Sequence, residues 1–211
     1  MNCEIITIGD ELLIGQVVDT NSAWMAQRLN EWGIELKQIT SVHDDEAHIV
    51  EALEAAFGRA DIVLTTGGLG PTKDDITKKV LCDYFGTCLV ANEEVHQHIL
   101  RLYANRPDVL NRLTATQWLV PQNADILTNR VGSAPIMVFQ HKVKGKRKLL
   151  MSMPGVPYEM QIAMEEQIAP YLRSHILDTK ATHIVHRHVM VYGIPESALA
   201  LRIEEWESQL P

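Results

Sequence analysis

Leu64-Thr65-Thr66-Gly67-Gly68-Leu69-Gly70-Pro71-Thr72-Lys73-Asp74-Asp75 is the stretch of sequence that decides the fold. A β-branched strand ends at Thr66, a glycine-rich loop follows, and helical spacing begins at about Ile76. Glycines let backbone N–H groups approach an anion without a Cβ in the way, and a helix N-terminus adds partial positive charge. The loop matches neither the GxGxxG nor the Walker pattern. On its residues alone, it predicts either a phosphate or nucleotide site or a structural turn capped by an aspartate.

Strands and helices alternate outward from this loop. Apolar runs predict strands at residues 4–8, 36–42 and 62–66, and caps and helical spacing predict helices at about 22–32, 46–57 and 76–84. This order is typical of right-handed βαβ crossovers, so the predicted fold class is α/β with a mostly parallel sheet. Farther along we expect two helices within 92–118 interrupted near Pro107, hairpin strands at 136–140 and 148–151, and a helix at about 158–171.

The predicted main domain comprises residues 1–172. Residues 173–211 contain a strand-like segment at 183–192 and a helix-like segment at 196–207. Two elements are too few to bury a core of their own easily, so this tail is interpreted as the start of a second module or as a docked appendage.

Composition and charge exclude several classes of protein. The 211 residues contain 19 Lys and Arg against 27 Asp and Glu, a net charge of −8, which argues against a general nucleic-acid binder. No apolar run approaches the roughly 18 to 20 residues that span a bilayer, and the first residues lack the pattern of a signal peptide. We therefore expect a cytoplasmic protein with neither membrane nor nucleic acid as a partner.

Three pairs of acidic residues follow predicted strands, at Asp10-Glu11, Asp44-Asp45 and Asp74-Asp75. A parallel sheet brings the carboxyl ends of its strands to one edge, so these carboxylates are expected to converge there. Because they would repel a bare phosphate, they suggest a divalent cation between protein and phosphate. The alternative for the second pair is that one aspartate merely caps the following helix.

Two further loops rich in Gly and Pro, residues 129–135 and 154–159, could line the same pocket. The Ser133 hydroxyl, free N–H groups near Gly155 and the Glu159 carboxylate could bind sugar or phosphate, although ordinary turn chemistry explains such loops equally well.

The histidines predict no metal site. His183, His186 and His188 lie close together in sequence without an acidic neighbour, and helix geometry turns His96 and His98 apart.

Several of these segments together resemble the CinA family of competence/damage-inducible proteins, specifically its N-terminal domain of the molybdopterin-binding, MoaB/MogA-like fold. The resemblance covers residues 3 to about 172 and is carried by 8–13 with Gly15, 19–22, 65–77, 129–135 and 154–160. It implies a three-layer α/β sandwich whose pocket lies at the sheet edge chosen by the acidic pairs. It also implies a homo-oligomer, either a trimer or a dimer.

The resemblance further implies a metal-dependent nucleotide pyrophosphatase that hydrolyses ADP-ribose to AMP and ribose 5-phosphate. The implied cofactors are a divalent cation, Mg²⁺, Mn²⁺ or Co²⁺, and often K⁺. Two alternatives remain, a protein that binds or adenylylates molybdopterin in molybdenum cofactor biosynthesis and a nucleotide-binding module without catalysis.

Each candidate residue receives an expected role. Asp75 is the expected metal ligand or water-orienting base, Asp44 and Asp10 complete the metal shell, and Lys73 offsets charge on the leaving phosphate. The residues expected to bind substrate include Asp10 again, and the first four are expected around the phosphate: Thr66, Gly67, Gly68, Gly70, Asp10, Asn21, Ser133, Gly155 and Glu159.

Three positions depart from the family pattern and predict a reshaped pocket. Ser133 stands where Thr is usual, Ile136 where Gly is usual, and Tyr158 where a small Ser is usual. The tail from Val191 to Ser197 resembles the start of a KH-like middle module. No counterpart of the nicotinamide-nucleotide amidase domain occurs in these residues, so no deamidation is expected of them.

Overall fold

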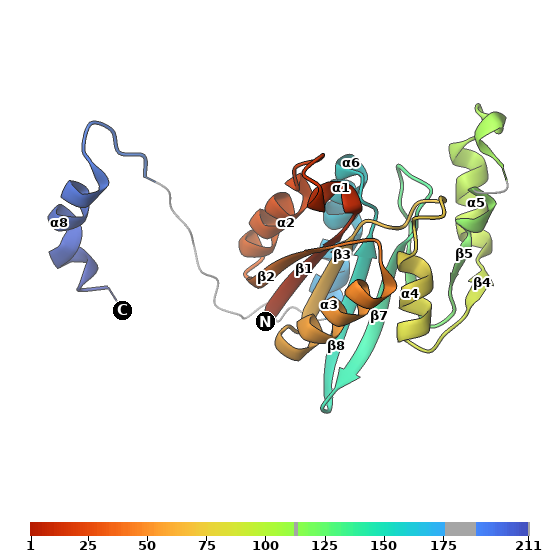
Figure 1. Ribbon diagram of the computed structural model, residues 1–211, viewed down its shortest axis with the longest axis horizontal. Coiled ribbons are helices and arrows are strands. Elements are labelled where there is room, and N and C mark those ends of the chain that lie inside the picture. Colours follow the sequence, from red (N-terminus) through yellow and green to blue (C-terminus); the bar gives the residue numbers. More distant parts are fainter. Residues whose placement is uncertain (112–113, 176–188, 211) are drawn as a thin grey trace.

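A six-stranded sheet forms the centre of the computed structural model, which describes residues 1–111, 114–175 and 189–210 (Figure 1). The strand order is β2 (Glu35–Val42), β1 (Asn2–Ile8), β3 (Ile62–Thr66), β8 (Lys146–Met153), β7 (Ile136–Val143) and β6 (Asp125–Leu127). The first four strands are parallel, whereas β7 and β6 are antiparallel to their neighbours. The predicted α/β class with a mostly parallel sheet is confirmed.

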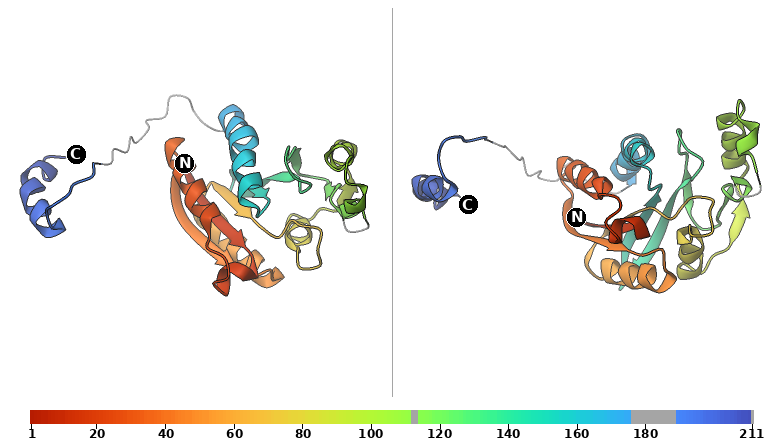
Figure 2. Two further views of the ribbon diagram at one scale, coloured as in Figure 1. Left: turned by 90° about the horizontal axis from the view of Figure 1, so that it is seen from above. Right: turned by 45° about the horizontal axis from the view of Figure 1, so that its top comes forward.

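Helices cover both faces of the sheet and give three layers (Figure 2). One face carries α2 (Thr20–Glu31) and α6 (Pro157–Ala163), which continues through a π-helical turn (Met164–Ile168) into α7 (Ala169–His175). The other face carries α3 (Glu46–Arg59) and α4 (Thr77–Tyr84). Alternation along β3 serves both layers, because Leu64 packs into the first core and Val63 into the second.

A small lobe stands beside this sandwich next to α4 (Figure 1). It comprises β4 (Leu89–Ala91), α5 (Glu93–Leu102) and β5 (Leu119–Pro121), and Val95, Ile99 and Val120 form its own small core. We call this unit, with the described residues that connect its elements, the α5 lobe.

The prediction of two helices within 92–118 is wrong in its second half. After α5 the described residues form only two short 3₁₀ turns, Pro107–Val109 and Thr114–Thr116. Proline has no N–H to continue a helix, and the Thr114 hydroxyl satisfies the carbonyl of Val109 locally. The four-residue helix α1 (Asp10–Leu13) and the three-residue strands β4 to β6 were not predicted.

The tail contains helix α8 (Glu196–Glu207), which matches the predicted helix. The predicted strand at 183–192 falls mostly on residues 176–188, outside the described part, and residues 189–192 have no regular structure. The division into two units at residue 172 stays a prediction. Among the described helices, none combines the length and the apolar character that crossing a membrane requires.

Candidate functional site

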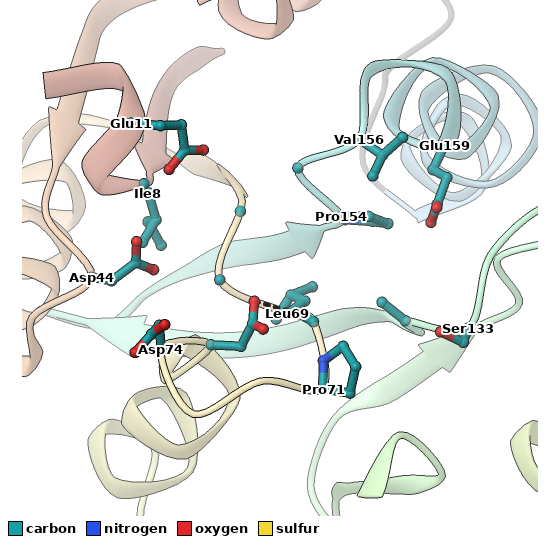
Figure 3. A pocket seen from close by; sticks show the side chains of 17 residues that line it. Ile8, Glu11, Asp44, Leu69, Pro71, Asp74, Ser133, Pro154, Val156 and Glu159 are labelled. Atoms are coloured by element: carbon teal, nitrogen blue, oxygen red, sulfur yellow. Dashed lines mark hydrogen bonds between the residues drawn. The ribbon is translucent and has the colours of Figure 1, made fainter. Parts of the chain in front are cut away.

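A pocket of about 530 Å³ opens at the carboxyl ends of β1, β3 and β8, within the range of small-molecule sites (Figure 3). The glycine-rich loop forms its floor, with the β2–α3 connection on one side and the loops 129–135 and 154–156 on the other. Its wall comprises Ile8, Gly9, Glu11, Asp44, Gly67, Gly68, Leu69, Gly70, Pro71, Asp74, Asp75, Ser133, Ala134, Pro154, Gly155, Val156 and Glu159.

Two glycines of the loop fit where no other residue could. Gly67 has a φ of 110°, and a Cβ there would lie 2.0 Å from the backbone oxygen of Ile8. Gly68 has a φ of 63°, and its Cβ would lie 2.0 Å from the Oγ1 of Thr77, the first residue of α4. That hydroxyl is buried and has no hydrogen-bond partner among the described residues. The loop therefore lies directly on the N-terminus of a helix, as phosphate-binding loops do.

Asp75 closes the glycine-rich loop from within. Its carboxylate accepts hydrogen bonds from the N–H of Gly70 at 2.7 Å, the N–H of Thr72 at 2.9 Å and the Thr72 hydroxyl. The same side chain and that of Asp74 also belong to the pocket wall. Asp75 therefore serves both interpretations of the loop, because it stabilises a structural turn and also faces a pocket that could bind phosphate.

The structure separates the roles of Asp44 and Asp45. Asp45 caps α3, because its carboxylate accepts from the N–H groups of Ala47 at 3.0 Å and His48 at 3.1 Å. Asp44 is left to line the pocket, and its Oδ1 approaches Gly68 closely enough that a Cβ there would lie 3.1 Å away.

Asp10 lies behind Asp44 rather than in the pocket wall. Each residue donates its N–H to the other's carboxylate, at 3.2 and 3.3 Å, and the Nδ1 of His43 lies 2.7 Å from the Oδ1 of Asp10. That hydrogen bond lowers the pKa of Asp10. The neighbouring residue Glu11 lines the pocket instead, so the structure brings the second member of the first acidic pair to the site.

Negative charge dominates the pocket. Five wall residues are carboxylates and none is Lys or Arg: Glu11, Asp44, Asp74, Asp75 and Glu159. Burial raises the pKa of Asp44, and the nearby carboxylates of Asp10, Glu11 and Asp75 also raise it. Lys73 is exposed and does not line the pocket. Within the described residues, no three His, Cys, Asp or Glu side chains are close enough to form a complete metal site.

Glu159 forms the opposite wall and is held by a buried amide. The Nδ2 of Asn129, a residue only 3% exposed, donates to the Oε2 of Glu159 at 2.7 Å and to the carbonyl of Ala134 at 3.0 Å. Gly132 packs against the same carboxylate, since a Cβ there would lie 1.9 Å from Oε2. Asn129 was not predicted as a site residue, and its only signal was its place at the start of a Gly- and Pro-rich loop.

Replacing Asn129 with Asp is expected to destabilise the protein by about 3 kcal/mol at pH 8, because two carboxylates would face each other without water between them. The loss should shrink as pH falls, since a shared proton restores a donor. Urea unfolding at pH 8 and pH 5.5 tests this, with Asn105→Asp at an exposed site as the control within about 0.5 kcal/mol of wild type. An equal loss at both pH values would contradict the account.

Asn21 and Thr66 support the loop 154–156 and do not line the pocket described above. The Thr66 hydroxyl donates to the carbonyl of Pro154 at 2.7 Å, and the Asn21 amide donates to the carbonyl of Gly155 at 2.7 Å. Gly155 in turn packs against the backbone of Gly67, where its Cβ would lie 3.2 Å from the Cα. These two predicted binding residues therefore hold the pocket's shape.

The α5 lobe also supports the glycine-rich loop. The side-chain amide of Gln117 donates to the carbonyl of Leu69 at 3.2 Å, and the buried Nζ of Lys78 donates to the carbonyls of Thr116 at 3.3 Å and Gln117 at 3.4 Å. Burial lowers the pKa of Lys78 to about 8 from its ordinary 10.5.

The Lys78 shift predicts a pH-dependent stability. Between about pH 8 and 10.5 the unfolded chain holds a proton on Lys78 that the folded chain has released, so stability rises with pH in this window. The free energy of unfolding of the wild type relative to Lys78→Met should therefore increase by about 2.5 kcal/mol between pH 7.5 and 10. Urea unfolding of both proteins at pH 7.5 and 10 checks this, and a difference that is constant with pH would contradict it.

Comparison with known proteins identifies the family of the chain. Residues 4–174 match the family model described as "Probable molybdopterin binding domain". The chain is 43% identical to a CinA-like protein of Flavobacterium psychrophilum, covering 100% of this chain and 49% of that protein. It is 39% identical to a protein of Pyrobaculum calidifontis, covering 98% of this chain and 76% of the other. The chain thus spans about half the length of the CinA-like relative.

Solved structures of CinA and MoaB proteins are similar to this chain. The protein CinA from Thermoplasma acidophilum superposes with a TM-score of 0.70 at 30% identity, covering 80% of this chain and 96% of that one. MoaB from Pyrococcus furiosus, a tungsten cofactor synthesizing protein, superposes with a TM-score of 0.55 at 19% identity over 82% of this chain and 95% of that one, which supports the fold alone. The chain therefore belongs to the family of probable molybdopterin binding domains and, within it, to the CinA-like proteins.

Proposed function

We propose that the chain hydrolyses a nucleotide diphosphate, foremost ADP-ribose to AMP and ribose 5-phosphate, with a divalent cation between the pocket and the diphosphate. One observation carries this proposal. A pocket of about 530 Å³ combines a glycine-rich loop on a helix N-terminus with five carboxylates and no basic wall residue. A diphosphate beside these carboxylates needs a cationic counter-charge, and no wall residue carries one.

The donor set of the pocket fits such a cation. Carboxylate oxygens are the ligands that Mg²⁺ and Mn²⁺ prefer, and Mg²⁺ is usually held by one or two carboxylates together with substrate phosphate oxygens. Asp44 and Asp75 would hold it together with phosphate oxygens of the substrate, and Glu11 rather than Asp10 adds a further negative charge at the wall. When bound, the cation would neutralise charge that develops on the diphosphate. K⁺ is proposed as a supplementary ion.

The chain's own residues would divide the remaining work. Gly67, Gly68 and Gly70 would let the backbone approach the phosphates. Asp44, whose carboxylate faces the pocket beside Gly68, would orient the attacking water. Glu159 and Ser133, on the opposite wall, would face the ribose (Figure 3). Lys73 would act only at long range, from outside the wall.

Release of AMP from ADP-ribose tests the proposal. The purified chain is incubated with Mg²⁺, Mn²⁺ or Co²⁺ plus K⁺, beside samples in EDTA and an Asp44→Asn variant. AMP and ribose 5-phosphate should appear in equal amounts with at least one metal and disappear in EDTA. No release with any metal, despite measurable nucleotide binding, would favour a binding module without catalysis.

The family model gives a specific reason for a second candidate, binding or adenylylation of molybdopterin. The same loop and carboxylates would then hold the phosphate of the pterin or of the nucleotide. Incubation of the chain with molybdopterin, ATP and Mg²⁺ distinguishes the two, because transfer of AMP to the pterin without hydrolysis of ADP-ribose would replace the first proposal. We also propose a homo-oligomer, a trimer or a dimer, which sedimentation would test.

A further inference from the structure

His98, which received no role from the sequence, contacts a loop of the pocket from the α5 lobe. Its Nε2 lies 3.2 Å from the carbonyl oxygen of Gly132, and a carbonyl can only accept, so Nε2 carries the proton and donates. The gap between α5 and the loop is a cavity of about 10 Å³, enough for one water at most. The loop is therefore packed directly on the helix at this point.

The residue that His98 holds is the one that meets Glu159. Gly132 packs so tightly against this carboxylate that a Cβ would lie 1.9 Å from its Oε2. On the inner side, Asn129 donates to both Glu159 and the carbonyl of Ala134. The loop 129–135 is thus held from inside by the Asn129 amide and from outside by His98. A shift of Gly132 would move the Glu159 carboxylate or open a gap beside it.

We propose that His98 is a positioning residue for the pocket, whose hydrogen bond to Gly132 fixes the loop that carries Ser133 and packs against the Glu159 carboxylate of α6. The inference rests on the proposed function for its activity measurement, but its structural part can be tested without substrate. It also gives the α5 lobe a structural role, because the lobe holds two loops of the pocket, the loop 129–135 through His98 and the glycine-rich loop through Gln117.

Replacing His98 with Gln or Asn tests the hydrogen bond to Gly132. Gln places its side-chain N–H near the position of a histidine Nε2, whereas Asn places it near Nδ1. His98→Ala and His98→Asn should raise the KM for ADP-ribose about 3- to 10-fold with kcat within about twofold, as expected for losing one hydrogen bond. His98→Gln should stay near wild type. His96→Ala is the matched control, because His96 lies on the same helix but contacts Glu93 and Trp118.

Hydrogen exchange of the backbone amides provides the measurement without substrate. In His98→Ala and His98→Asn the amides of residues 131–134 should exchange about 3- to 10-fold faster, while those of α5 stay unchanged and His98→Gln restores the loop. Unchanged exchange of the loop in His98→Ala, or a Gln variant no better than Asn, would overturn the inference. If the exchange behaves as expected and no variant or wild type releases AMP, the positioning role stands and the proposed function falls.

Discussion

Asp44→Asn is expected to reduce AMP release from ADP-ribose at least about 100-fold without lowering the stability of the protein. The side chain keeps its shape and its place beside Gly68, so the loop is not disturbed. What is lost is a charged oxygen that faces the pocket and could hold the cation or orient water. Steady-state turnover and thermal unfolding of the same preparations provide the two measurements.

The stability part of this prediction follows from the direction of the pKa shift. Burial and the neighbouring carboxylates disfavour the ionised form of Asp44 in the folded protein. Between the ordinary pKa of 3.8 and the raised pKa of folded Asp44, the folded state therefore holds more of this proton than the unfolded state. The free energy of unfolding falls as pH rises through that window. A neutral amide removes that effect, so the variant should be at least as stable as wild type at pH 7.

Asp45→Ala is the matched control. This residue is adjacent in sequence but caps α3, so its loss should cost about 1 kcal/mol of stability and leave turnover almost unchanged. Asp44→Asn should thus lose turnover but not stability, whereas Asp45→Ala should lose stability but not turnover. Full turnover in Asp44→Asn, or a loss of activity in Asp45→Ala that matches it, would remove Asp44 from the site.

Gly67→Ala is expected to destabilise the protein by about 3 kcal/mol or more and to abolish nucleotide binding. The residue has a φ of 110°, which L-residues with a side chain rarely adopt, and the new methyl group would meet the backbone oxygen of Ile8 at 2.0 Å. Because that atom is backbone in the interior strand β1, relief requires movement of the sheet or of the loop. Urea unfolding measures the cost directly.

Ala substitutions at two other glycines separate the cost in stability of a positive φ from the cost of a steric clash at the new Cβ. Gly15 has a φ of 74° with no atom within 4 Å of its Cβ position, so Gly15→Ala should cost only about 1 kcal/mol. Gly58 lies in α3 with open space and no unusual φ, so Gly58→Ala should raise stability by about 0.5 to 1 kcal/mol. A Gly67→Ala variant no less stable than Gly15→Ala would contradict the close packing of the loop.

The glycine-rich loop and the convergence of carboxylates could be predicted because both follow from local rules. Glycine spacing marks the loop, and parallel strands necessarily end at one edge of the sheet. Which member of the first two acidic pairs faces the pocket could not be predicted. That choice depends on where α1 and α3 begin, since one residue of difference turns a side chain by about 100° around a helix.

Asn129 and His98 were beyond prediction for a different reason. Each acts on a residue that lies at least 30 positions away, Glu159 for the first and Gly132 for the second. Their contacts exist only once the α5 lobe and α6 are packed in place. The three-residue strands β4 to β6 were missed because so short a run shows no period of two.

Binding of Mn²⁺ in the presence and absence of an ADP-ribose analogue with a methylene group between its phosphorus atoms tests most directly whether a cation bridges pocket and diphosphate. Paramagnetic resonance of free Mn²⁺ gives the metal affinity without turnover. The account predicts that the analogue raises the affinity for Mn²⁺ at least about tenfold, and that Mn²⁺ raises the affinity for the analogue by the same factor. An analogue that binds equally well in EDTA would contradict a metal-bridged site among these carboxylates.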